Sequence, residues 1–373
     1  MKKQIKKSKP EHKQKTKSQK ALKILGISLG GVMIFGATLG LARLLFPKEV
    51  EKPTPEISAS EETSLVEVSF GDTTVKAETV NEALTTVYTG LQDGTYTSPV
   101  DSTITYHVYG HNETQGRSDE EIANKQYISF SMNGIFDKVN IIGQGEDAEL
   151  ELASDDSQAV TFQFTDDCGL RSYSLDGTDV YISNVSFLDN RPNASGWEHG
   201  YIEFSVGYSG SLVLDNCKFL GNGLSLWHGE SITVTNCTFD TESGKYAMWI
   251  GANAFGSGYR DTLKNVTIDS CVFTGNRGIK ILTDIHTTNE AGQVYERTSQ
   301  AIKIQNCAFK DLIEKPGIVI DCSLDTSSIG NESKLTITNT TFEGCEKGDV
   351  EAETGKGIQY TLNGNVVSVD SVE

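Results

Sequence analysis

The sequence predicts an all-β solenoid, a parallel β-helix, preceded by one N-terminal transmembrane helix and a disordered linker. Three observations carry this prediction. A short phrase recurs six times between residues 177 and 345, helical periodicity is scarce, and an uncharged apolar run follows a lysine-rich N-terminus.

Residues 1–23 form a basic tail, and residues 24–46 are expected to anchor the chain in a membrane. The stretch Ile24 to Ala42 carries no charge, and as a helix it would extend about 28 Å, close to the thickness of a bilayer core. Because the lysines precede this segment, we expect the N-terminus in the cytoplasm and the rest of the chain outside the cell. A cleaved signal peptide is the alternative, but its apolar core is normally shorter, at about 7–15 residues.

Residues 47–64 are rich in Pro, Glu and Ser and are expected to be a disordered spacer. The charge balance changes across this region. Up to Lys48 the chain has 12 bases and one acid, which leaves 20 bases and 50 acids for the remainder. Such asymmetry is typical of parts that face different compartments, and the acid excess gives no basis for a nucleic-acid partner. We therefore expect residues 65–373 to form an extracellular domain.

The repeated phrase is a period-2 apolar strand followed by Asn, a small residue, one variable residue and Phe, as in "SITVTNCTFD". Its copies end at Phe187, Phe219, Phe239, Phe273, Phe309 and Phe342. The copies are spaced 32, 20, 34, 36 and 33 residues apart. Repeats of this length indicate a solenoid, because one unit cannot bury its own apolar face. The units hold short strands and leave no room for a long helix, which favours a parallel β-helix with coils about 4.8 Å apart.

Each position of the phrase then becomes a column along the solenoid. The Phe residues are expected to stack inside, and Asn at the turn suits a left-handed backbone. That turn column consists of Asn184, Asn216, Asn236, Ser270, Asn306 and Asn339. Four of the seven cysteines also share a column, and we expect buried free thiols there rather than disulfides: Cys217, Cys237, Cys271 and Cys307.

From about Val75 to Val369 this pattern resembles the right-handed parallel β-helix, or pectin-lyase-like, superfold. The segment "VNEALTTVYTGLQDGTYTSP", which begins at Val80, resembles its first coil, and "FDKVNIIGQGEDAELEL", which begins at Phe136, resembles its second. The resemblance implies a right-handed coil. It fixes no activity, because the superfold hosts lyases, hydrolases, esterases, tail spikes and non-catalytic surface proteins.

A candidate binding face comes from the strands that follow each Phe. If Ile202, Met248 and Ile279 point inward, then the next residue of each strand points outward, which gives the column Glu203, Ser225, Trp249, Lys280 and Val319. Further polar and aromatic residues are expected at the ends of the same strands: Trp227, His228, Asp284 and His286. Tryptophan on such a face stacks well against a sugar ring. Packing of tryptophan beneath loops is an equally open alternative.

We therefore expect a membrane-anchored cell-surface protein that binds a polysaccharide, and a neutral one in view of the acid excess. The candidate ligand-binding residues are Glu203, Trp227, His228, Trp249, Lys280, Asp284 and His286. One alternative is a polysaccharide lyase or glycoside hydrolase that uses Glu203, Lys280, Asp284 and neighbouring histidines; another is a structural or adhesive spacer. Three coil steps would place Glu203 and Lys280 about 14 Å apart, too far to form one acid–base pair. The sequence assigns no catalytic residue, cofactor or metal.

Overall fold

The structure, a computed structural model, describes the chain from Leu65 onward, with gaps. The described residues are 65–98, 102–114, 117–118, 125–130, 135–152, 159–164, 168–169, 172–173, 177–189, 202–207, 209–221, 223–226, 229–251, 263–282, 286–288, 294–296, 301–321, 334–352 and 358–369. The expected tail 1–23, transmembrane segment 24–46 and linker 47–64 lie outside them. Within the described ranges, no helix combines the length and the apolar character needed to cross a bilayer.

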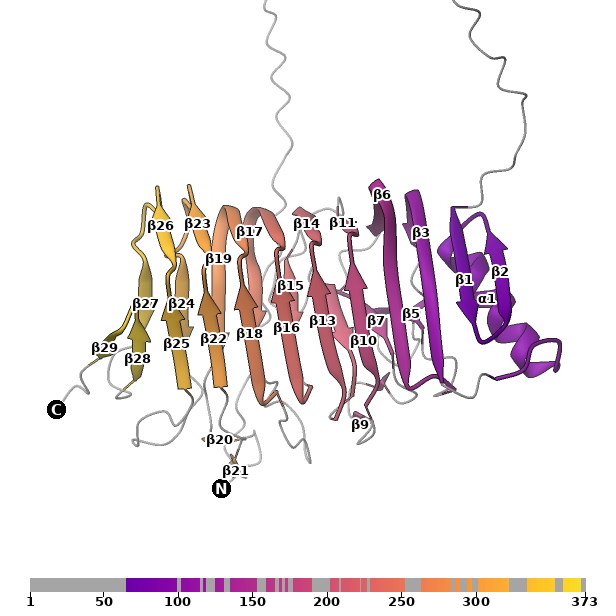
Figure 1. The fold of residues 1–373 in the computed structure, drawn as a ribbon. Coiled ribbons are helices and arrows are strands. Elements are labelled where there is room, and N and C mark those ends of the chain that lie inside the picture. Colours follow the sequence, from indigo (N-terminus) through magenta and orange to yellow (C-terminus); the bar gives the residue numbers. More distant parts are fainter. Residues whose placement is uncertain are drawn as a thin grey trace, which may run out of the picture. The chain divides into compact units, whose positions relative to one another are not determined.

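The N-terminal end of the solenoid is covered by a hairpin and a helix (Figure 1). Strands β1 (Val66–Phe70) and β2 (Thr73–Ala77) pair antiparallel, and β1 also pairs with β3. The segment from Val80, expected to form the first coil, is instead helix α1 (Val80–Gln92). Thr79 explains this difference, because its side chain accepts the N–H of Glu82, and the Glu82 carboxylate accepts the N–H of Glu78 in return. The first parallel strand of the solenoid is therefore β3.

Behind this cap the strands form three parallel stacks, one strand of each stack per coil (Figure 1). The first stack begins with the N-terminal parts of β3 (Thr103–Thr114) and β6 (Lys138–Leu152). It continues through β10 (Asp179–Ser183), β13 (Ser211–Asp215), β16 (Ser231–Thr235), β18 (Asn265–Asp269), β22 (Ala301–Gln305), β25 (Lys334–Thr338) and β28 (Gln359–Leu362). Strand β29 (Asn365–Ser368) then pairs antiparallel with β28.

The second and third stacks share some long strands that bend from one face to the next. The second comprises the C-terminal parts of β3 and β6, then β11 (Ser186–Leu188), β14 (Lys218–Gly221), the first parts of β17 (Thr238–Ile250) and β19 (Val272–Leu282), β23 (Ala308–Lys310) and β26 (Thr341–Glu343). The third comprises β5 (Lys125–Ser129), β7 (Ala159–Gln163), β12 (Ile202–Ser205), β15 (Leu224–Leu226), the second parts of β17 and β19, β24 (Ile318–Asp321) and β27 (Val350–Ala352).

Three short pairings lie outside the stacks. Strand β4 (Arg117–Ser118) pairs antiparallel with β5, and β8 (Cys168–Gly169) pairs with β9 (Ser172–Tyr173). Strand β20 (His286–Thr288) pairs with β21 (Val294–Glu296) in a separate two-stranded sheet.

The expected phenylalanine column is confirmed. Its members pair in register along the second stack, and neighbouring rings lie 4.6–5.0 Å apart with interplanar angles of 5–12°. The five rings from Phe187 to Phe309 are at most 1% exposed, whereas Phe342, in the last coil of this stack, is only partly buried. Aliphatic side chains of the first and third stacks, such as Ile232 and Ile279, fill the rest of the interior, and with the phenylalanines they form one continuous core.

The turn column is also confirmed, because all six of its residues have φ between 49° and 57°. Asn216 donates to the side chain of Asn184, as a continuous asparagine ladder requires. Asn236 and Asn306 differ, since they donate to the carboxylates of Asp215 and Asp269 in the preceding coils. The bonds of Asn306 and Gln305 lower the pKa of Asp269. These asparagines thus tie their turns to the preceding coils, whereas the Ser270 side chain donates to Asp269 of its own coil.

The four cysteines of the shared column are buried and form no disulfide, as expected. Each thiol donates to a main-chain carbonyl of its own coil or of the coil before it. Hydrogen bonds with Cys217 and Cys271, together with burial, raise the pKa of Cys237. These residues therefore serve as small core side chains.

Candidate functional site

The outward column predicted from the sequence exists in the third stack. Glu203 pairs with Ser225, Ser225 with Trp249, Trp249 with Lys280 and Lys280 with Val319. The alternation of inward and outward residues in these strands is what places them on one face. The register also confirms that three steps separate Glu203 from Lys280. Lys280 instead forms an ion pair with Asp321, at 2.8 Å between Nζ and Oδ2.

Trp249 is half-buried at the centre of this column. The Lys280 ammonium lies 4.6 Å from the centroid of its ring, and Tyr246 contacts it edge-on, with centroids 6.0 Å apart. The indole Nε1 is buried. Because the cation covers one face of the ring, a ligand that stacks there must displace Lys280 or bind beside it. Trp249 therefore has both a structural role in the column and a partly accessible surface.

Of the other predicted site residues, the structure describes only His286. Trp227, His228 and Asp284 lie outside the described residues. His286 was expected at the end of a solenoid strand, and this expectation is wrong. Strand β19 ends at Leu282, and His286 lies in β20, where it pairs with Glu296 of β21.

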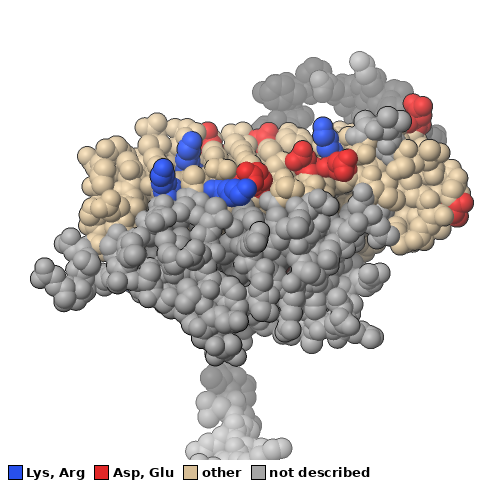
Figure 2. Space-filling model, turned by 90° about the horizontal axis from the view of Figure 1, so that it is seen from below, with Lys and Arg blue, Asp and Glu red and all other residues tan. Residues whose placement is uncertain are grey.

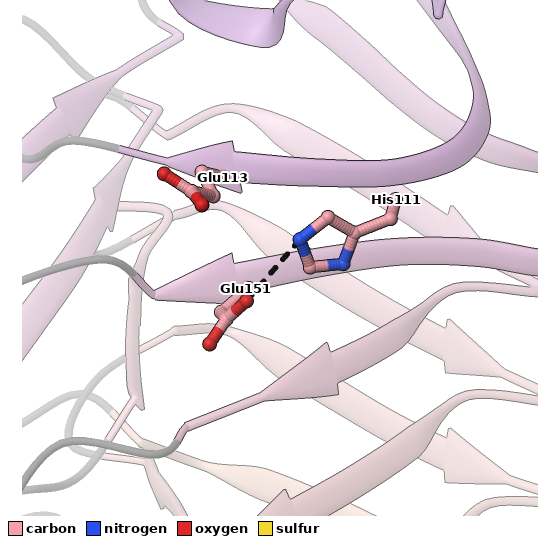
Figure 3. Close-up of side chains that lie close together, drawn as sticks. All are labelled: His111, Glu113 and Glu151. Atoms are coloured by element: carbon pink, nitrogen blue, oxygen red, sulfur yellow. Dashed lines mark ion pairs between the residues drawn. The ribbon is translucent and has the colours of Figure 1, made fainter.

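A second cluster, which sequence reasoning missed, lies on the outward face of the second stack near the N-terminal cap (Figure 3). His111 of β3 pairs in register with Glu149 of β6, and Glu113 pairs with Glu151. The ring Nδ1 of His111 is 2.8 Å from Glu149 Oε1, and Nε2 is 3.2 Å from Glu151 Oε2. The hydrogen bond to Glu149 and the charges of Glu149, Glu151 and Glu113 raise the pKa of His111. We call these four residues the His111 cluster.

A sequence signal for the His111 cluster does exist. "HNE" at residues 111–113 and "ELE" at residues 149–151 both place charged groups two positions apart, which is the spacing of one strand face. The two phrases lie on different coils, however, and nothing in either phrase shows that β3 pairs with β6. His111 was therefore not among the candidate residues predicted from the sequence.

The described surface carries charges of both signs close together. Figure 2 shows Lys and Arg side chains beside Asp and Glu along the described strip of the solenoid. Ion pairs between neighbouring coils include Lys264 with Glu230 and Arg277 with Glu314. Cations that are neutralised in this way do not form a continuous basic strip for a polyanion.

Comparison with known proteins supports the fold. A family model described as a right-handed β-helix region matches residues 128–289. This range runs from the fourth residue of β5 to just beyond β20, and so covers the central coils, including the Trp249 column as far as Lys280. No curated protein and no solved structure matches the chain. The match and the stacks of parallel strands together support a right-handed parallel β-helix fold, and neither gives a substrate.

Proposed function

We propose that this chain is a membrane-anchored cell-surface protein whose pectin-lyase-like β-helix binds a neutral polysaccharide along the Trp249 column. In this proposal residues 24–46 span the membrane, the basic tail is cytoplasmic, and residues 47–64 hold the domain away from the lipid. The support for the anchor is the uncharged run from Ile24 to Ala42 and the lysines before it.

The observation that carries the binding proposal is the position of Trp249. A large aromatic side chain lies on an outward column and remains half-buried instead of fully enclosed. The neighbouring ion pair of Lys280 and Asp321 adds donors and acceptors next to the ring, with both side chains about one fifth exposed. An aromatic surface flanked by hydrogen-bonding groups suits the mixed apolar and hydroxyl surface of a sugar.

Electrostatics supports a neutral ligand. The chain beyond Lys48 has 30 more acids than bases, and Lys280 is neutralised by Asp321. A polyuronate would therefore meet repulsion from the domain, and the cation that the structure describes over the Trp249 ring is already paired with a carboxylate. A neutral chain lying across the coils could contact the partly exposed side chains of Trp249 and Lys280 on neighbouring coils about 4.8 Å apart, whereas Ser225 of the same column is buried.

The test is binding of the full-length chain to an array of neutral and acidic glycans, with analysis of products for every glycan that binds. We expect Trp249→Ala to weaken binding by about 1–3 kcal/mol, since the stacking surface is removed while the inward ladders remain. Tyr181→Ala is the matched control, because Tyr181 is an exposed aromatic on the first stack. Equal binding by wild type and the Trp249 variant would refute the site.

A structural or adhesive spacer is the second candidate, and the packing of Trp249 against Tyr246 and Lys280 favours it. An array on which no glycan binds would support the spacer. A polysaccharide lyase or hydrolase using Glu203 and Lys280 is less favoured, because three coil steps separate these two residues. Cleavage products from a bound glycan would favour the lyase or hydrolase.

A further inference from the structure

The His111 cluster brings one imidazole against three carboxylates on neighbouring strands. Glu149 and Glu151 face His111 from β6, and Glu113 follows His111 on β3. Figure 3 shows His111 with Glu113 and Glu151. One nitrogen or oxygen from each of His111, Glu113 and Glu151 can lie within 4.8 Å of the other two. The cluster belongs to the second stack, so it is independent of the Trp249 column on the third stack and of the function proposed for it.

With a neutral imidazole, the contact between His111 and Glu151 would join two hydrogen-bond acceptors. A neutral imidazole carries one N–H, and the 2.8 Å contact with Glu149 places it on Nδ1. The lone pair of Nε2 then faces the carboxylate of Glu151 at 3.2 Å. Two acceptors at this distance repel each other unless a cation, either a proton or a metal ion, lies between them.

We propose that His111 Nε2 and the carboxylates of Glu113 and Glu151 bind a divalent metal ion of the Zn²⁺ type. Zinc binds nitrogen and carboxylate oxygen at about 2.0–2.2 Å, so two ligand atoms of a tetrahedral site lie about 3.3 Å apart. The observed separation between Nε2 and Glu151 Oε2 already has this value. The side chain of Glu113 is exposed and can rotate to close the remaining distance.

Glu149 has a positioning role in this site. Metal-binding histidines usually donate their other ring N–H to a carboxylate, which fixes the tautomer and the direction of the ligating nitrogen. Glu149 accepts from Nδ1 in this way. The His111 side chain is 49% exposed, so an ion can enter from solvent and keep water in its open position.

The ligand types select the class of metal. Calcium and magnesium prefer sites made only of oxygen, whereas imidazole suits zinc and related transition metals. One imidazole with two carboxylates therefore favours Zn²⁺ over Ca²⁺.

The test is isothermal titration of the full-length, untagged and metal-stripped chain with ZnCl₂ at neutral pH. We expect one saturable ion that binds more tightly than Ca²⁺. Affinity should fall at least about 10-fold in His111→Gln and Glu113→Gln, which remove ligand atoms at similar size, and about 10- to 100-fold in Glu149→Gln. His107→Ala is the matched control: His107 lies on the same strand but contacts Gln144, at 3.0 Å, and its loss should leave affinity unchanged.

A measurement without substitutions guards against variants that fail to fold. The imidazole NMR signals of His111 in the wild-type chain should shift on addition of one equivalent of Zn²⁺. Three outcomes would overturn the proposal: no saturable Zn²⁺ binding, full binding by a folded His111→Gln variant, or tighter binding of Ca²⁺ than of Zn²⁺. A His111 signal that responds to pH but not to Zn²⁺ would show that a proton alone fills the cluster.

Discussion

Truncation of one central ring of the phenylalanine ladder should destabilise the whole solenoid. Phe239 is 1% exposed and lies between Phe219 and Phe273, with ring centroids 4.8 and 5.0 Å away. Phe239→Ala removes the buried ring and leaves a cavity that rigid neighbouring coils cannot collapse to fill. Substitutions of this kind cost about 3–5 kcal/mol, which here includes the loss of two stacked contacts.

The position of Phe342 provides a matched control from the same column. Phe342, in the last coil of this stack, stacks on Phe309 with ring centroids 4.9 Å apart and is only partly buried. Because its side chain already contacts water, we expect Phe342→Ala to cost about half as much, roughly 1–3 kcal/mol.

Denaturant unfolding followed by far-ultraviolet circular dichroism measures both variants against the wild type. Nearest-neighbour coupling in a solenoid can broaden the transition, so midpoints and slopes should both be compared. Equal losses in the two variants, or a loss below about 1 kcal/mol for Phe239→Ala, would refute the argument that stacked burial stabilises the coils.

Three further predictions concern the columns and turns. The four column cysteines should not react with a thiol reagent until the chain unfolds, because they are buried; mass analysis that finds them alkylated in the native protein would contradict this. Asn236→Ala should cost about 1–2 kcal/mol in thermal unfolding, since φ is 55° there, and Asn236→Gly should cost less. The carboxyl of Asp269 should titrate below its usual pKa of 3.8 by NMR. Because the pKa of Asp269 is lower in the folded state, its carboxylate contributes to stability above the unfolded pKa of about 3.9. That contribution is lost as pH falls through the folded pKa. A titration midpoint at or above 3.8 would be inconsistent with the bonds from Asn306 and Gln305.

The sequence by itself determined the repeat and what each position of it does. Phe recurs in all six copies of the phrase that ends at Phe187 in its first copy, Asn recurs in five of them and Cys in four, each at a fixed place. In a parallel β-helix equivalent residues stack directly, so the linear repeat becomes a spatial column without further information. The column of Glu203, Trp249 and Lys280 followed from the same logic, because strand alternation has a period of two residues.

Only the tertiary structure decided which side chains of neighbouring coils contact each other. Helix α1 formed where the first coil was expected, and it is stabilised by the Thr79 cap and by burial of one helical face. Lys280 pairs diagonally with Asp321, and His111 meets Glu149 and Glu151 across 38 and 40 positions of sequence. Such contacts depend on which strands pair and in which register. The segments that connect these strands differ in length, so a local pattern of residues does not show which side chains meet.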